Sequence, residues 1–413
     1  MNRGASNSVD TVGSVSPARR RALILVENLS VPLDRRVWQE ALALTAAGYD
    51  VVVLCPQGKD RDTEPYVVLD GVEIHRFPLR PASGALDYLR EYAQAAWRIR
   101  RGVRRLARGR TFDVVHACNP PDLLLLAALS LKRRGSRFVF DHHDLVPELY
   151  LSRFGRGRDL GYRAFLALER LSFRLADVVV ATNESYREVA LTRGRKHEDD
   201  VFVVRNGPDL GRFRPGPVDA SLRRGKAHLL AYVGMMGPQD GIEEAVRALG
   251  RLAEVRRDWH ALFVGDGDVV PAMRDLAAQL GLDDAVEFTG LAAQDEVVRV
   301  LSSADLCLAP EPSSPLNDVS TMIKVAEYMA MGKPVAAFDL KETRRTAEGA
   351  ALFARPNDVG DLARCIDELL TDGELRARLG AAGRARAESA LAWEHSVAAL
   401  TAAYERALAR GAA

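Results

Sequence analysis

The chain has few cysteines, almost no net charge and no long apolar run. Its four cysteines stand far apart among 413 residues and form no CxxC pair, which argues against a disulfide framework and favours reduced thiols in the cores of a cytoplasmic protein. No run of about 18 apolar residues is present, so we expect no membrane-spanning helix. The formal net charge of +1 gives no electrostatic reason to expect nucleic acid as a partner.

The amino-terminal stretch also lacks the features of a signal peptide. Residues 1–21 are rich in Ser, Gly and Val, contain no apolar stretch before a cleavage site, and end in the three consecutive arginines Arg19 to Arg21. We therefore expect a disordered tail at this end of the chain.

From residue 22 onwards, apolar strand-like runs alternate with amphipathic helical stretches. Such repeated strand–helix units predict parallel sheets that are covered by helices on both faces. A stretch dense in Gly and Pro at 205–217 is typical of an interdomain linker. We therefore expect an α/β protein with two Rossmann-like domains, at 22–205 and 206–390. The predicted strands are 22–27, 51–55, 72–77, 113–117, 138–141, 178–181, 201–204, 229–233, 261–264, 286–288, 306–309 and 335–338.

The segment 305–344 carries the most informative functional pattern. It predicts a strand that ends at Pro310, a polar loop, a helix over 320–331 and a second strand after a Gly-Lys-Pro stop. Free backbone N–H groups and the dipole at the start of such a helix form an anion site. Lys324 and Glu327 are three residues apart, so they share one face of the helix.

This segment resembles the donor-binding segment of the family-4 glycosyltransferases, which have the two-domain GT-B fold. The resemblance implies two Rossmann-like domains facing a cleft, and a carboxyl-terminal helix within 391–413 that crosses back onto the first domain. It also implies that the second domain binds most of a nucleotide-diphosphate sugar. Lys324 would then meet the diphosphate and Glu327 the ribose hydroxyls; a solvated lysine and an exposed helix glutamate are the ordinary alternatives.

The glycine loop after the strand 229–233 departs from the family pattern. Met235 and Asp240 stand where the family usually has an Arg and a Lys that touch the diphosphate. We expect Lys324 to replace them, because lysine is rare in this chain, with 7 among 57 basic side chains. The loop residues expected at the donor are Gly234, Met235, Met236 and Gly237.

A second departure affects the sugar. Val319 stands where the family has the first Glu of its Glu-x7-Glu pair, so Asp318 or Asn317 is expected to take over sugar contacts. The identity of the donor sugar therefore does not carry across from the family. The remaining residues expected to line the donor site at this helix start are Ser320, Thr321, Met322 and Ile323.

Two further turns of the second half match the family. Residues 264–268 contain Asp-x-Asp, a metal–nucleotide pattern in other glycosyltransferases, but here the run follows a strand and opens a helix. We therefore expect Gly265 and Gly267 to form the turn and Asp266 to approach the donor, with no dedicated metal site. A later turn resembles the edge of the nucleobase pocket, although a purely structural glycine turn is an equal alternative; its residues are Thr289, Gly290 and Leu291.

In the first half, His116 stands at a predicted strand end before a turn, which is a cleft position in doubly wound sheets. It matches the family histidine that meets the transferred sugar near the reacting carbon. The ordinary alternative for a histidine beside an apolar strand is a satisfied core residue.

Polar residues after two other strands are expected on the acceptor side. Asp141, His143 and Glu148 fit acceptor-binding or interdomain groups, whereas metal binding by the run 141–144 is disfavoured because adjacent side chains point apart. At 34–36 a helix begins with two arginines, which fits a phosphorylated acceptor, and exposed surface arginines are the equal alternative. The residues concerned are Asp34, Arg35 and Arg36.

Local charge indicates a membrane surface. Between residues 87 and 110 eight arginines face two acids, with aromatic and aliphatic residues interleaved, which suits an anionic lipid surface. An amphipathic helix that packs its apolar side on a sheet is the alternative.

The resemblance implies a retaining, metal-independent glycosyltransferase with no cofactor besides its nucleotide-sugar co-substrate. The reacting groups would be His116, Lys324 and Glu327. The acceptor would be lipid-linked or a glycan of the cell surface, and the enzyme would lie in the cytoplasm or on the inner face of the membrane. A sugar-nucleotide epimerase of the same fold and a non-catalytic glycan- or lipid-binding relative remain as alternatives.

Overall fold

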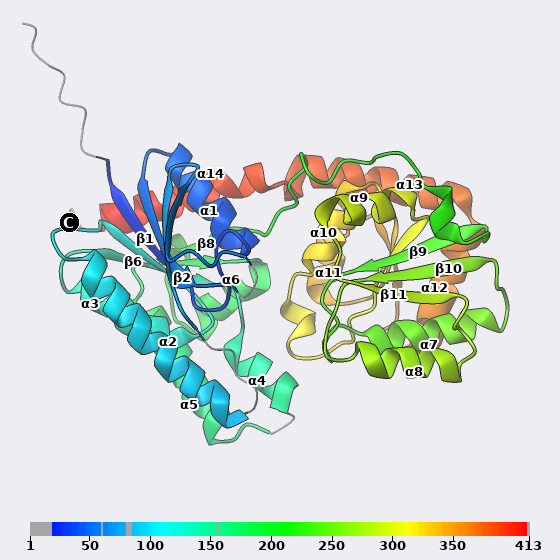
Figure 1. Cartoon of the computed structure of the whole chain (residues 1–413), viewed down its shortest axis with the longest axis horizontal. Coiled ribbons are helices and arrows are strands. Elements are labelled where there is room, and N and C mark those ends of the chain that lie inside the picture. Colours follow the sequence, from blue (N-terminus) through cyan, green and yellow to red (C-terminus); the bar gives the residue numbers. More distant parts are fainter. Residues whose placement is uncertain (1–18, 59–60, 80–84, 155–156, 411–413) are drawn as a thin grey trace, which may run out of the picture.

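The computed structural model describes residues 19–58, 61–79, 85–154 and 157–410, and within them the chain forms two α/β domains (Figure 1). Each domain is built on a sheet whose strands pair in parallel, apart from one antiparallel edge strand in the first sheet. The last helix crosses back from the second domain to the first (Figure 1). The expected GT-B fold class is therefore confirmed.

The first sheet has the order β3-β4-β2-β1-β5-β6-β7-β8 and the second the order β11-β10-β9-β12-β13-β14, among the residues described. The strands are β1 Arg21–Leu25, β2 Asp50–Pro56, β3 Tyr66–Leu69, β4 Val72–Phe77, β5 Val114–Cys118, β6 Arg137–His142, β7 Val178–Ala181, β8 Val201–Val203, β9 His228–Val233, β10 Trp259–Val264, β11 Val286–Gly290, β12 Leu306–Ala309, β13 Val335–Phe338 and β14 Ala351–Ala354.

Helices connect most of these strands. They are α1 Arg35–Ala46, α2 Ala85–Leu106, α3 Leu125–Lys132, α4 Val146–Phe154, α5 Leu160–Leu175, α6 Glu184–Thr192, α7 Ile242–Ala253, α8 Val270–Gln279, α9 Gln294–Ser303, α10 Ile323–Ala330, α11 Lys341–Thr346, α12 Val359–Thr371, α13 Gly373–Arg386 and α14 Trp393–Ala409. Short helical turns include η1 Asp122–Leu124, η2 Glu198–Asp200, η3 Ala220–Arg223, η4 Asn317–Val319 and the π-helical η5 Ala387–Leu391.

Both faces of the first sheet are buried, which explains its continuous apolar strands. In β1, Leu23 and Leu25 pack with α2, α3, α5 and α6, whereas Ala22 and Ile24 pack on the other face with α1 and α14. This alternation follows from the two-residue period of a strand. The crossover helix α14 is therefore part of the core of the first domain.

The second sheet is covered in the same way. Helices α7, α8 and α12 pack on one face, and α9, α10 and η5 pack on the other. The four cysteines are all buried and unpaired, as expected for core thiols. Among the described residues no helix combines the length and apolarity needed to cross a bilayer.

Three expectations need correction. The edge strands β3 and β14 were not predicted, and β3 is hard to recognise because alternate side chains lie in solvent. The helix predicted over 320–331 begins only at Ile323, after an extended Met322. Strand β1 begins at Arg21, inside the predicted tail 1–21, of which residues 1–18 lie outside the described part.

Candidate functional site

The glycine loops after β9 and β10 pack against each other at the carboxyl edge of the second sheet. A Cβ atom at Gly265, where φ is 141°, would overlap the carbonyl oxygen of Gly234. A Cβ atom at Gly241 would likewise overlap the carbonyl oxygen of Pro310 in the loop after β12. These glycines are therefore required by the contact between loops, whether or not a ligand is bound.

The methionines of the first glycine loop have opposite environments. Met235 is 64% exposed, at the place where the family usually has an arginine. Met236 is fully buried in the core of the second domain, so its side chain is not available to the donor, and the loop's contact with the donor stays a prediction. The Met236 backbone is also occupied, because its N–H donates to the carbonyl of Asp266.

Lys324 lies beneath the glycine loop and is already neutralised. Its Nζ donates to Glu311 Oε1 at 2.5 Å and to the Tyr232 hydroxyl at 2.8 Å, and it lies 3.9 Å from Asp240 Oδ1. Burial alone would lower the pKa of Lys324, but the Glu311 carboxylate outweighs burial and raises it. Lys324 is thus a cation held between two acids, and one of these acids occupies the place of the expected family lysine.

Glu311 is a candidate site residue that the sequence analysis did not identify. Its carboxylate is 1% exposed and follows β12 directly into the cleft edge. One oxygen accepts from Lys324, while Oε2 has no hydrogen-bond partner among the described residues. A buried acceptor without a partner costs free energy, so this oxygen is suited to a ligand donor such as a sugar hydroxyl.

Glu327 lies where the two domains meet. Its carboxylate accepts from Arg35 Nη1 of the first domain at 3.3 Å. Burial raises the pKa of Glu327, so the carboxylate is held in a poorly hydrated position. Gln294 Oε1 accepts from both Arg35 and the linker residue Arg212, at 3.4 and 3.2 Å.

These groups border a cavity of about 380 Å³ between α1, the linker and α10. Arg35 was expected on the acceptor side, but it lies beside Glu327, the residue expected to bind ribose. The cavity lining includes Arg35, Trp38, Asn206, Arg212, Ile323 and Glu327.

The polar groups expected to replace the missing family glutamate are already used. Asn317 is buried, and its Nδ2 donates to the carbonyls of Gln239 and Pro312, both at 2.9 Å. Asp318 Oδ2 accepts from Ser313 at 3.2 Å. Asn317 therefore braces the loop, and the prediction that its amide reads the sugar is wrong.

The remaining predicted donor residues lie along the same edge. Asp266 is exposed and its carboxylate accepts from the N–H of Gly267, while Leu291 is 77% exposed. Thr289 Oγ1 is within 3.1 Å of the carbonyl of Gly290. Their contacts with a donor stay predictions.

His116 does not lie in the cleft, and the prediction that it meets the sugar is wrong. It is fully buried within β5, and its Nδ1 is 2.9 Å from the hydroxyl of Tyr404 on α14. Its Nε2 is 3.7 Å from Glu40 and 3.9 Å from Asp141. The crossover helix covers this face of the sheet, so His116 is a core histidine.

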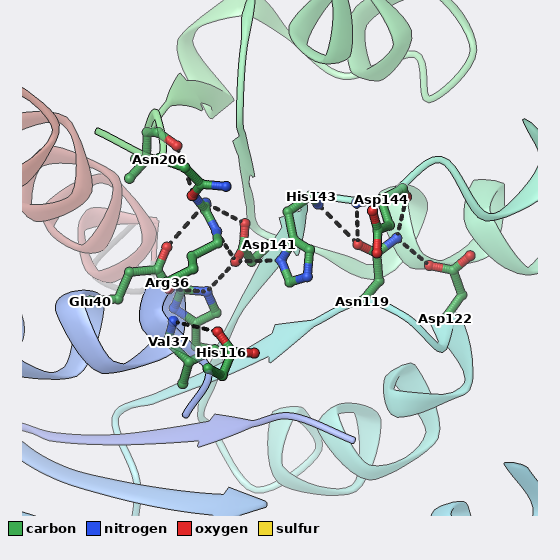
Figure 2. Close-up of polar contacts among 12 residues, drawn as sticks. Arg36, Val37, Glu40, His116, Asn119, Asp122, Asp141, His143, Asp144 and Asn206 are labelled. Carbon is green, nitrogen blue, oxygen red and sulfur yellow. Dashed lines mark hydrogen bonds and ion pairs between the residues drawn. The ribbon is translucent and has the colours of Figure 1, made fainter. Parts of the chain in front are cut away.

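Arg36 and Asp141 form the centre of a buried network (Figure 2). Arg36 makes two hydrogen bonds to Asp141, at 2.8 and 2.7 Å, and further bonds to Asn206 Oδ1 and the carbonyl of Val204. Burial opposes the charge of Asp141, but Arg36 outweighs burial and holds the pKa of Asp141 well below its usual range. Neither group is free for an acceptor, so both acceptor-side predictions are wrong.

One group in this network has the composition of a metal site. Glu40, His116, Cys118 and Asp141 offer ligand atoms that all lie within 4.8 Å of one another. However, Arg36 already pairs with both carboxylates, at 3.0 Å from Glu40 and 2.7 Å from Asp141. The arrangement fits a charge-paired core rather than an ion-binding centre.

His143 is the histidine that lies at the cleft edge of the first sheet. Asn119 Oδ1 accepts from the backbone N–H groups of His143 and Asp144 and so fixes the loop after β6 (Figure 2). Burial disfavours the charged ring, but Asp141 at 3.1 Å outweighs it and raises the pKa of His143 to about 9. A cationic, partly exposed imidazolium therefore faces this end of the first domain.

Two other acceptor-side candidates have structural partners. Asp34 caps α1 by accepting from the N–H of Val37. Glu148 forms an ion pair with Arg193 of the same domain at 2.7 Å rather than a contact with the second domain, and a contact with an acceptor stays a prediction.

Helix α2 has one buried side and one basic side. Ile99, Val103 and Leu106 pack on the sheet, as the amphipathic alternative predicted, while Trp97 remains 58% exposed. The side chains of 85–93 lie outside the described part. The outward side carries the exposed arginines Arg100, Arg101, Arg104 and Arg105, and the exposed Arg108 follows the end of the helix.

Two family models match consecutive parts of this chain. "Glycosyltransferase Family 4" matches residues 33–212 and "Glycosyl transferases group 1" matches residues 227–372. A glycogen synthase of Mycobacterium tuberculosis is 28% identical over 401 residues, which cover 92% of each protein. A 2-deoxystreptamine glucosyltransferase of Streptomyces kanamyceticus is 28% identical over 256 residues, 59% of this chain and 64% of that protein.

Solved structures share the fold at low sequence identity. A sucrose-phosphate synthase from Thermosynechococcus elongatus superimposes with a TM-score of 0.76 at 20% identity, covering 95% of this chain and 100% of the other. HepE of Anabaena, solved with UDP and glucose, has a TM-score of 0.70 at 19% identity and covers 92% of this chain and 98% of the other. These likenesses concern the arrangement of the two domains.

Proposed function

We propose the function of this chain from the premise that it belongs to glycosyltransferase family 4 and transfers a sugar from a nucleotide-sugar donor. The finer proposal concerns how this chain holds the donor. The observation that carries it is the meeting of Glu327 from the second domain, Arg35 from the first and Arg212 from the linker around one cavity.

The nucleoside end of the donor is proposed to lie in this cavity. Glu327 accepts hydrogen bonds from the ribose hydroxyls. The low hydration of its carboxylate makes these bonds stronger than they would be in open solvent. Leu291, exposed at the end of β11, offers an apolar surface to the base. HepE was solved with UDP, so a uridine nucleotide is the first to test on this chain.

The diphosphate end requires cations that the glycine loop does not provide. Lys324 is offset by Glu311 and Asp240, so its charge alone does not balance a diphosphate. We assign the missing positive charge to Arg35 and Arg212, which approach the same cleft from outside the second domain. The backbone N–H groups at the start of α10 add a preorganised dipole.

The proposed reaction retains the configuration of the transferred sugar and uses no metal. The acceptor hydroxyl oxygen bonds to the anomeric carbon while the bond from that carbon to the diphosphate oxygen breaks. The acceptor proton passes to the departing diphosphate on the same face. Closure of the domains excludes water that would otherwise hydrolyse the donor, and His143 replaces His116 as the histidine proposed to lie near the transferred sugar.

The acceptor is proposed to be a lipid-linked molecule or a cell-surface glycan. The outward face of α2, with Trp97 among four exposed arginines, is suited to anionic headgroups. Sedimentation with vesicles tests this: binding to phosphatidylglycerol but not to phosphatidylcholine, lost when Arg100 and Arg104 are changed to Glu, is expected. Equal binding of the variant would remove α2 from the proposal.

Calorimetric titration of UDP-, GDP- and dTDP-sugars tests the donor site, with Glu327→Gln as the matched variant. We expect one nucleotide to bind the unchanged protein, and to bind the variant about 10- to 100-fold more weakly, because a charged hydrogen-bond acceptor is lost. Turnover with and without EDTA should be equal. Product formed without any acceptor would favour the epimerase, and absence of binding by all three would favour the non-catalytic relative.

A further inference from the structure

A loop of the donor site is held by the opposite domain. Asn183 follows β7 at the carboxyl edge of the first sheet, and the segment 319–321 follows β12 at the carboxyl edge of the second. The Asn183 amide Nδ2 donates to the carbonyl of Val319 and to Oγ1 of Thr321, both at 2.9 Å. These bonds join groups more than a hundred residues apart in the sequence.

Asn183 performs a second task with its other amide atom. Its Oδ1 accepts from the N–H of Tyr186 at 2.8 Å and so caps the start of α6. The side chain is fully buried, and both of its polar atoms are satisfied. Since the cap fixes the orientation of the amide, Nδ2 points at the second domain without further ordering.

Neighbouring contacts make this a built interface. The Tyr186 hydroxyl is 3.3 Å from Ser320 Oγ, and Ser185 Oγ donates to Glu342 Oε1 of α11 at 2.6 Å. Glu342 is fully buried and also accepts from Arg345, so its charge is neutralised where the domains meet. Figure 1 shows α6 and α11 facing each other between the two domains.

The segment 319–321, which Asn183 contacts, lies next to the proposed donor site. Val319 ends the short helix η4, Ser320 is extended, and the segment leads through the extended Met322 into α10, whose first turns carry Lys324 and Glu327. The side chains of Asn317 and Asp318 anchor the other end of the segment within the second domain. The orientation of the start of α10 therefore depends on contacts from both sides.

We infer that Asn183 is a positioning residue that couples the closure of the two domains to donor binding, by holding segment 319–321 and thereby the start of α10. This inference rests on the proposed donor site. A donor that binds the held form of α10 shifts the domains towards the closed state, and closure in turn strengthens donor binding by the same factor.

Asn183→Asp tests the inference with little disturbance of the fold. Aspartate is an equally good helix cap, so α6 keeps its start, but a carboxylate cannot donate to Val319 and repels its carbonyl. We expect about tenfold weaker binding of the nucleotide found by calorimetry, from the loss of two interdomain hydrogen bonds, with an unchanged melting temperature. Thr321→Val should weaken binding less, and should add nothing to Asn183→Asp in a double-mutant cycle.

A distance measurement separates this inference from the donor site. The four native cysteines are buried, so thiol labels can be placed at exposed positions of each domain, through Asp199→Cys and Arg251→Cys. Electron–electron distance spectroscopy measures the distance between the two labels. In Asn183→Asp we expect a longer mean distance and a broader distribution of distances than in the labelled protein that keeps Asn183. If the nucleotide fails to bind the unchanged protein, the proposed donor site is wrong, and the distance then tests only whether Asn183 holds the two domains together.

The control is Glu188→Gln, which removes the exposed interdomain pair of Glu188 with Lys341 at 3.1 Å. We expect it to change neither affinity nor distance, because exposed pairs contribute little. Unchanged affinity and unchanged distance in Asn183→Asp would overturn the inference. So would a lower melting temperature with unchanged affinity, since that result indicates only a role in the fold.

Discussion

The carboxyl edges of the two sheets use similar residue types for different purposes. At the first edge, Arg36 and Asp141 are buried and pair with each other, and His116 bonds to Tyr404 of the crossover helix that covers them. At the second edge, Glu311 keeps an unpaired oxygen and Glu327 borders a cavity. The comparison teaches that charged residues at a strand end mark a ligand site only where no other element of the chain covers them.

The largest effect is expected from disrupting the buried charge network at the edge of the first sheet. Asp141→Asn removes the bidentate partner of the buried Arg36 and leaves only Glu40 to pair with it, and we expect it to lower the free energy of unfolding by about 3–5 kcal/mol. Urea denaturation measures this loss. The exposed pair of Glu243 and Arg247 supplies the control, because Glu243→Gln should change stability by less than about 1 kcal/mol. A stable Asp141→Asn protein with reduced activity would instead make Asp141 a ligand-binding group.

Glu327→Gln removes the charge that borders the cavity at the edge of the second sheet. Because Glu327 is held against an exposed arginine at a cavity, we expect its loss to weaken donor binding about 10- to 100-fold and to leave the melting temperature within a degree or so. Parallel calorimetry and thermal unfolding separate the two quantities. A large fall in the melting temperature with little loss of affinity would place Glu327 with the structural charges of the first domain.

A pH series sharpens the comparison by a smaller effect. Burial raises the pKa of Asp122 from 3.8 to about 8, and Asp141 raises that of His143 from 6.5 to about 9 against the effect of burial. Both groups hold a proton more tightly in the folded state than in the unfolded state. The stability that each supplies is therefore complete below its pKa in the unfolded state, and is lost as the pH rises through its folded-state pKa of about 8 or 9. We expect the melting temperature to fall between pH 6.5 and 9.

The variant Asp122→Asn identifies the source of this pH dependence. The amide mimics the protonated acid, so the variant should lose part of the slope and melt about 3 °C higher than the unchanged protein at pH 8. An identical slope in both proteins would show that Asp122 does not titrate in this range.

Asp240→Asn should have the smallest effect. It removes one of the two acids near Lys324 and keeps an oxygen to accept from the N–H of Gly237. We expect nucleotide-diphosphate affinity to rise about threefold at low salt, because the site loses one negative charge, and to fall back as salt is added. Unchanged or weaker affinity at low salt would show that the acids beside Lys324 do not oppose the binding of the diphosphate.

The fold was predictable because buried parallel strands have an unmistakable apolar pattern. The two strands that escaped notice, β3 and β14, lie at sheet edges with partly exposed side chains, where that pattern is weak. The start of α10 was placed three residues early because Ser320 and Thr321 have the composition of a helix start. Their side chains instead meet the first domain, a contact that local sequence does not encode.

The site was predictable in the second domain and less so in the first. Glu327 belongs to a local pattern of strand, loop and helix, and such a pattern can be recognised from neighbouring residues in the sequence alone. His116 is a core residue partly because it bonds to Tyr404, which is 288 residues away in the sequence, and no local signal identifies that partner. Glu311 and Asn183 were missed for a related reason, since a glutamate after a strand and an asparagine before a helix are ordinary until their neighbours in space are known.

The central claim is that the donor occupies the second edge while the charges of the first edge hold the fold. Hydrogen exchange with and without UDP tests it most directly. We expect UDP to slow exchange in the glycine loop 234–241 and in 311–327, and to leave β5 and β6 unchanged because they are already buried. Slower exchange confined to β5, β6 and their following loops, with none in 311–327, would contradict the claim.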